Sequence, residues 1–113
     1  MMRRFAVVIA LVLAVAGCRS YVKATGDFKV DIAGEERAID VHAGLATIRV
    51  LNRGACPVAV RHGEEIYLLN TSDDKEIVLR GQHVIHLERR GIGEGLVEVH
   101  FVAEGRYNTV NLR

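Results

Sequence analysis

Histidine is the residue type in this sequence best suited to bind a metal ion, and the chain has five: His42, His62, His83, His86 and His100. A zinc site needs three or four converging ligands, and no Cys-x-x-Cys or His-Glu-x-x-His motif supplies them. His83 and His86 are three residues apart on an expected strand, so their side chains should point to opposite faces. We predict no metal site and keep His86 and His100 as weak candidates, because a hairpin would pair their strands.

The thiol of Cys56 is the second group that could do chemistry. It lies in the segment Gly54-Ala55-Cys56-Pro57, where its neighbours are apolar and no adjacent Lys or His activates it. We therefore expect a buried, unreactive thiol. The alternative is an intermolecular disulfide, since a lone thiol in an oxidising compartment is either buried or available for pairing.

Neither the carboxylates nor the glycine-rich segment forms a catalytic motif. Nothing in the sequence pairs two carboxylates for acid–base chemistry, and no Gly-x-Ser-x-Gly nucleophile motif occurs. The segment Gly91-Ile92-Gly93-Glu94-Gly95 is similar to a phosphate-binding loop, but such loops open a helix, and here a strand is expected to follow. We predict a β-hairpin turn at this segment, no catalytic residues, no cofactor and no enzymatic activity.

The first 17 residues have the three parts of a secretory signal peptide. Met1-Met2-Arg3-Arg4 is a positive region, Phe5 to Ala16 is apolar, and small residues precede Cys18. As a helix the apolar run would rise roughly 20 Å, less than the roughly 30 Å hydrocarbon core of a bilayer. Residues 1–17 are therefore predicted to be a signal peptide rather than a membrane span.

The end of this segment resembles the lipobox of bacterial lipoproteins. The matching residues are Leu13-Ala14-Val15-Ala16-Gly17-Cys18, with Val15, Ala16 and Gly17 directly before the cysteine. The resemblance implies that the chain is cut before Cys18, and that this residue carries a diacylglyceryl group and an acyl chain such as palmitate. Two or three acyl chains would make the anchor effectively permanent. The alternative is cleavage by the general signal peptidase, which would leave Cys18 unmodified.

The residue after the cysteine is Arg19 rather than Asp. In lipoproteins an aspartate at this position retains the protein in the inner membrane, so the resemblance implies the outer membrane, facing the periplasm. The charge balance argues against nucleic acid as a partner. The chain has 15 Lys and Arg and 14 Asp and Glu, and loss of Arg3 and Arg4 leaves 13 basic residues. Nucleic-acid binding needs a clustered basic face, which this composition does not favour.

Residues 18–27 are predicted to be the lipidated cysteine and a short linker, and residues 28–113 a single all-β domain. From Phe28 onward, apolar residues alternate with a period near two, and short segments are separated by Gly, Asn or Asp. About nine strands are expected, at 28–32, 38–41, 46–51, 57–61, 66–69, 76–79, 82–88, 96–102 and 107–112. The first two should form a hairpin through the turn at Gly34.

Regular short strands with turn signals predict a small antiparallel β-sandwich, because a sheet with an apolar face must bury that face. The stretch from Thr47 to Val60, together with Leu79-Arg80-Gly81-Gln82, resembles Ig-like or jelly-roll modules of bacterial surface proteins. The resemblance covers about a third of the chain and names no specific family.

The leading functional hypothesis is a membrane-anchored envelope lipoprotein with a non-enzymatic binding or structural β-domain. An exposed strand edge would let an envelope protein partner add a strand. The alternative is a small metal- or ligand-binding periplasmic protein that uses surface histidines. A surface protein without a specific ligand is the third hypothesis.

Overall fold

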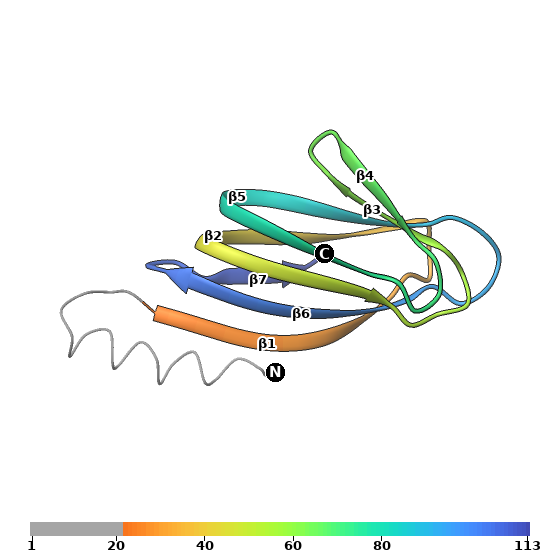
Figure 1. Cartoon of the computed structure of the whole chain (residues 1–113), viewed down its shortest axis with the longest axis horizontal. Helices are drawn as coiled ribbons and strands as arrows, with labels where there is room; N and C mark the ends of the chain where they lie inside the picture. Colours follow the sequence, from red (N-terminus) through yellow and green to blue (C-terminus); the bar gives the residue numbers. More distant parts are fainter. Residues whose placement is uncertain (1–21) are drawn as a thin grey trace.

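The computed structural model describes residues 22–113, and all regular elements in that range are β-strands (Figure 1). The predicted all-β class is therefore confirmed. The signal segment, the lipobox and Cys18 lie outside the described residues. The strands are β1 (Val22–Asp31), β2 (Glu36–Asn52), β3 (Val58–His62), β4 (Glu65–Leu69), β5 (Asp74–Arg89), β6 (Leu96–Gly105) and β7 (Thr109–Leu112).

The strands pair antiparallel in the order β1-β6-β2-β5-β3-β4, and β7 pairs with β2 beside this path. The two longest strands, β2 and β5, are paired with each other from Glu36 and Glu88 at one end to Leu51 and Asp74 at the other. Both strands turn back on themselves at the same end of the molecule (Figure 1). The sheet thus folds over into two layers, which is the predicted β-sandwich.

Each layer contains one half of β2 and one half of β5. The first layer consists of β1, β6, the second half of β2 and the first half of β5. The second layer consists of β7, the first half of β2, the second half of β5, and the hairpin of β3 and β4. Strand β4 is an edge of the second layer, and β1 is an edge of the first.

Glycines make the bend between the layers sterically feasible. A β-bulge interrupts the β2–β5 register between Ala43 and Ala46. A Cβ atom on Gly44 would lie 2.9 Å from the carbonyl oxygen of Glu104, so the backbones of β2 and β6 approach too closely there for a side chain. On β5, Gly81 has a φ of 88°, a conformation that L-residues rarely adopt. The sheet therefore bends where glycine permits both the close contact and the backbone geometry.

The bulge also keeps the apolar side chains of β2 on the inside of the sandwich. Ile39 and Val41 point inward before the bend, and Ile48 and Val50 point inward after it; all four are buried. One extra residue changes the inward set from odd to even positions, which a regular strand could not do. The two layers therefore share one hydrophobic core, in which each buried large aliphatic side chain contributes about 1.5–3 kcal/mol.

Asn52 is the one buried polar residue of the described range, and it ties together the loops at the end opposite the bend. Its amide nitrogen donates to the carbonyl oxygens of Cys56 and Leu69, each at 2.9 Å. Its side-chain oxygen accepts from the backbone N–H of Gly54 at 2.9 Å. Because every polar atom of the side chain is used, the residue is buried without an unpaired group.

Residues 22–113 form seven strands rather than the predicted nine. The segments 38–41 and 46–51 are two halves of β2, and 76–79 and 82–88 are two halves of β5. Gly44 and Gly81 look like strand ends in the sequence. At a bulge or a bend, however, strand pairing continues through the glycine, so each pair of predicted segments is one strand.

Two predicted hairpins are wrong. Strand β1 does not pair with the following strand but with β6, where Phe28 lies opposite Val99. The segment Gly91–Gly95 connects β5 to β6, which are not neighbours because β2 lies between them. Sequence neighbours are separated in both cases because the connections cross from one layer to the other, whereas a hairpin stays within one layer.

The boundary between linker and domain also needs correction. Residues 22–27, within the predicted linker 18–27, belong to β1, with Val22 opposite Gly105 and Asp27 opposite His100. The sequence signal is weak because Gly26 occupies a position where an apolar side chain would be expected. The ring of Phe101 fills this space, since a Cβ on Gly26 would lie 2.8 Å from it.

We predict that Asn52→Ala lowers the free energy of unfolding by about 2 to 4 kcal/mol, because it leaves two buried carbonyl groups and one buried N–H without partners. Urea denaturation followed by circular dichroism measures this loss. The matched control is Asn111→Ala, at an exposed position of β7, which should change the unfolding free energy by less than about 0.5 kcal/mol. Equal effects of both substitutions would contradict the assigned role of Asn52.

Candidate functional site

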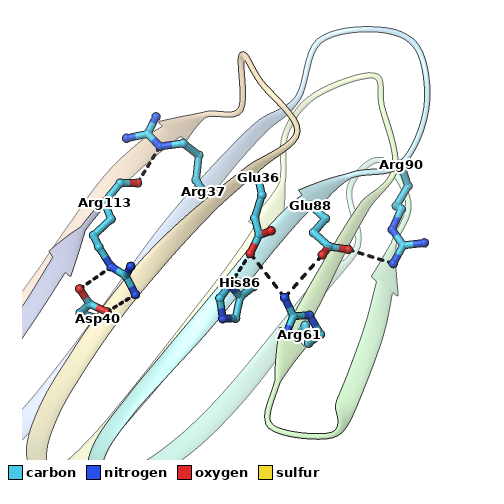
Figure 2. A network of polar contacts seen from close by, with 8 residues as sticks. All are labelled: Glu36, Arg37, Asp40, Arg61, His86, Glu88, Arg90 and Arg113. Carbon is cyan, nitrogen blue, oxygen red and sulfur yellow. Dashed lines mark hydrogen bonds and ion pairs between the residues drawn. The ribbon is translucent and has the colours of Figure 1, made fainter.

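The outer face of the second layer carries a group of charged side chains, which we call the charged network: Glu36, Arg61, His86, Glu88 and Arg90 (Figure 2). Strand pairing brings most of its members together. His86 of β5 lies opposite Arg61 of β3, and Glu88 of β5 lies opposite Glu36 of β2. These residues therefore come from three adjacent strands and from the segment that follows β5.

Arg61 links the two carboxylates of the network. Glu36 and Glu88 face each other across β2 and β5, an arrangement that is repulsive when both are ionised. The Arg61 guanidinium lies 3.5 Å from Glu36 and 3.6 Å from Glu88. Arg90 pairs with Glu88 at 2.9 Å, and the ring of His86 contacts Glu36. The cations thus compensate the repulsion between the two glutamates.

The charged network is a surface feature rather than a buried catalytic centre. Its side chains are between one quarter and one half exposed, and exposed ion pairs contribute only about 0–1 kcal/mol each. Glu36, Glu88 and Arg90, with Glu35 and Arg89, line a shallow open depression. Such an open, charged surface is better suited to contacting a macromolecule than to enclosing a small ligand.

Exposed apolar side chains lie next to this network on edge strand β4. Ile66 is 57% exposed and Leu68 is 58% exposed. In the strand register Ile66 lies opposite Arg61 and Leu68 lies opposite Ala59, on the same outer face. We call Ile66 and Leu68 the β4 patch. An exposed apolar pair on an unprotected sheet edge is a feature that soluble monomers usually avoid.

The predicted weak metal candidates do not come together. His86 belongs to the second layer, where it contacts Glu36. His100 belongs to β6 in the first layer, where it lies 3.1 Å from Glu98 and 3.7 Å from Asp27. The expected hairpin between their strands does not form because β2 separates β5 from β6. The predicted pairing of His86 with His100 is therefore wrong.

A different histidine pair is in direct contact. Nε2 of His62 lies 3.1 Å from Nδ1 of His83, between the end of β3 and the middle of β5. The ring of His42 instead stacks on Tyr107, with ring centroids 5.9 Å apart. The sequence held no signal for the first contact, because His62 and His83 belong to strands that become neighbours only through the folded topology.

The side chain of Tyr67 forms a second polar group beside the histidine pair. Its hydroxyl donates to the carboxylate of Glu65 at 2.6 Å, and the ammonium of Lys75 lies 4.1 Å from the centre of its ring. The hydrogen bond to Glu65 raises the pKa of the Tyr67 hydroxyl above 10.0, because the carboxylate stabilises the protonated form; burial and the charge of Glu65 act in the same direction.

Cys56 is buried, as predicted, and its thiol contacts the carbonyl oxygen of Pro57 at 3.3 Å. Among residues 22–113, no group of three or more His, Cys, Asp or Glu residues is arranged to hold a metal ion. Within the same range no helix is long and apolar enough to cross a membrane. The predicted lipidation site, Cys18, and the lipobox residues Val15, Ala16 and Gly17 lie outside the described residues.

Comparison with known proteins adds no functional assignment. No family model matches the sequence, and no curated protein matches it. The geometry of the described residues therefore carries the functional argument.

We predict that Glu65→Gln lowers the pKa of the Tyr67 hydroxyl toward 10.0, because a neutral amide accepts the hydrogen bond more weakly than a carboxylate. An NMR titration of the ¹³Cζ resonance of Tyr67 measures this shift. Glu64→Gln, in the same turn between β3 and β4, is the matched control and should leave the titration unchanged. An identical pKa in wild type and Glu65→Gln would contradict the assignment.

Proposed function

We propose that this protein is a lipid-anchored component of the bacterial envelope, whose β-sandwich binds an envelope protein through strand β4. The lipobox-like sequence ending at Cys18 supports the anchor. The β4 patch supports the binding role and is the observation on which it depends. Acyl chains on Cys18 would hold the domain at the membrane, while β4 would supply the contact.

An extended segment of a partner is the occupant that β4 fits best. β4 pairs with β3 on one side only, so its other edge presents backbone N–H and C=O groups. Residues Ile66 and Leu68 alternate with inward-facing Tyr67 and Leu69, which gives an added strand apolar contacts on the outer face. Backbone hydrogen bonds would provide affinity, and these side chains would provide specificity.

The charged network adds polar selectivity to this surface. Protein interfaces commonly combine an apolar centre with a polar rim. Here the apolar pair on β4 adjoins Arg61, which is partly exposed and already lies between two carboxylates. A partner strand with a complementary charge pattern would meet these groups at the rim of the interface.

The start of β1 determines which end of the sandwich would face the membrane. Four Cα–Cα steps separate Cys18 from Val22, a distance of at most about 15 Å. Val22 lies opposite Gly105, and its carbonyl oxygen accepts a hydrogen bond from Asn108 at 2.8 Å. The end of the molecule with the β6–β7 turn would therefore lie against the bilayer, and Tyr107, 69% exposed, would sit at this end.

The proposed placement in the outer membrane, facing the periplasm, rests on Arg19, the residue after Cys18. The loops around 32–35, 53–57 and 90–95 lie at the other end of the strands and would point into the periplasm (Figure 1). Strand β4 is joined through β3 to the last part of β5, so it would lie in the half of the sandwich farther from the membrane, where a periplasmic segment of a partner could reach it.

We predict that Cys18→Ala moves the protein from the membrane fraction to the soluble fraction of cells and abolishes incorporation of labelled palmitate. The domain should keep its protease resistance, because β1 begins only at Val22. Fractionation, palmitate labelling and mass spectrometry of the mature wild-type chain measure these outcomes. An unmodified Cys18 in the wild type would contradict the anchor.

We predict that Leu68→Glu eliminates a discrete crosslinked product with an envelope protein, because the new charge disrupts the β4 patch. The matched control is Val78→Glu, since Val78 is 60% exposed on the outer face of the other layer. Crosslinking of the full chain in intact cells, followed by blotting, compares the two variants. Loss of the product in both variants, or in neither, would contradict a partner site on β4.

A further inference from the structure

We propose that His62 and His83 form a binding site for one divalent transition-metal ion, with Zn²⁺ and Cu²⁺ as the matching class. The proposal is independent of the lipid anchor and of the β4 patch. His62 ends β3 opposite Ile85 of β5, and His83 lies two residues from Ile85, so both histidines are on the same face of the sheet. Both side chains are partly buried, and their ring centroids are 5.0 Å apart.

The hydrogen bonds of His83 determine which of its nitrogens is free to bind a metal. Nε2 of His83 lies 2.7 Å from the carbonyl oxygen of Arg80, which only accepts, so Nε2 carries the proton. Nδ1 of neutral His83 therefore presents a lone pair toward His62. The Arg80 carbonyl also orients the ring. A backbone carbonyl that accepts from the second ring nitrogen is the usual partner of a metal-binding histidine.

His62 completes the pair by a change of tautomer. Without a metal ion, its Nε2–H donates to Nδ1 of His83 across 3.1 Å. With a metal ion, the proton of neutral His62 would reside on Nδ1 instead, exchanged through water, and Nε2 would bind the metal. No net proton is gained or lost, because each imidazole stays neutral.

The distance between the two nitrogens suits a shared metal ion. Zinc–nitrogen bonds are about 2.0–2.1 Å long. Two such bonds with their nitrogens 3.1 Å apart enclose an angle of about 100° at the metal, between the octahedral and tetrahedral values. The site therefore needs little movement of either ring to accept the ion.

One carboxylate lies on the same face of the sheet as the histidine pair, and it accepts the hydrogen bond of Tyr67. Glu65 lies directly opposite His62 in the β3–β4 register, so its side chain is on the same face of the sheet. The described residues contain no group of three metal-binding side chains, so water molecules would complete the coordination. Such a site exchanges metal with solvent, and Cu²⁺ should bind more tightly than Zn²⁺.

Metal binding to the purified full chain tests the proposal. The chain carries Cys18→Ala, which removes that competing thiol, and has no polyhistidine tag. Isothermal titration with Zn²⁺ should show one equivalent bound, and the electron paramagnetic resonance spectrum of bound Cu²⁺ should show two nitrogen ligands. His83→Ala should weaken binding by more than about 10-fold, the least effect expected when even an outer-shell partner is lost.

His62→Gln is the sharper variant, because its amide can still donate to Nδ1 of His83 but is a poor metal ligand. It should keep the wild-type unfolding transition and lose metal binding. His100→Ala, which removes an exposed histidine of the other layer, should bind as the wild type does. Undiminished binding by His62→Gln, equal loss in His100→Ala, or no binding by the wild type would overturn the proposal.

Discussion

The pairing of β2 with β5 is the constraint on which the rest of the structure depends. Strands β6 and β7 pair with β2, and β3 pairs with β5. The two edge strands are attached indirectly, β1 through β6 and β4 through β3. The pair folds at Gly44 and Gly81, where a side chain would clash or the backbone adopts a left-handed conformation. The layers therefore stay aligned because they share two continuous strands, rather than through side-chain packing alone.

The β3–β4 hairpin carries the residues of greatest functional interest on its two faces. Its outer face presents Ile66 and Leu68 beside Arg61 of the charged network. Its inner face holds His62 near Glu65 and against His83 of β5. The hairpin is held by the pairing of β3 with the last part of β5. Both surfaces therefore depend on one short ladder of backbone hydrogen bonds.

The period-two pattern of apolar residues was sufficient to predict the all-β class, because it reports which side chains face a core. It could not predict pairing between distant strands. A glycine such as Gly44 or Gly81 gives the same sequence signal whether a strand ends there or bends there. Gly26 interrupts the apolar pattern at the start of β1, because the ring of Phe101 fills the space that a side chain at position 26 would need. The contact of His62 with His83 depends on the neighbouring positions of β3 and β5, so composition and spacing alone did not reveal it.

The strand order has a consequence for the way in which the chain reaches its final structure. Among the strands of residues 22–113, only β3 and β4 are neighbours both in the chain and in the sheet. Strand β1 can pair only after β6 has been synthesised. The first half of β2 gains its second neighbour only after β7 has been synthesised. Closing such long loops is entropically costly, and topologies of this kind fold slowly. Until β6 has been made, β1 has no partner strand and the first layer lacks two of its strands, so we expect this part of an incomplete chain to remain extended enough to be threaded through a narrow passage.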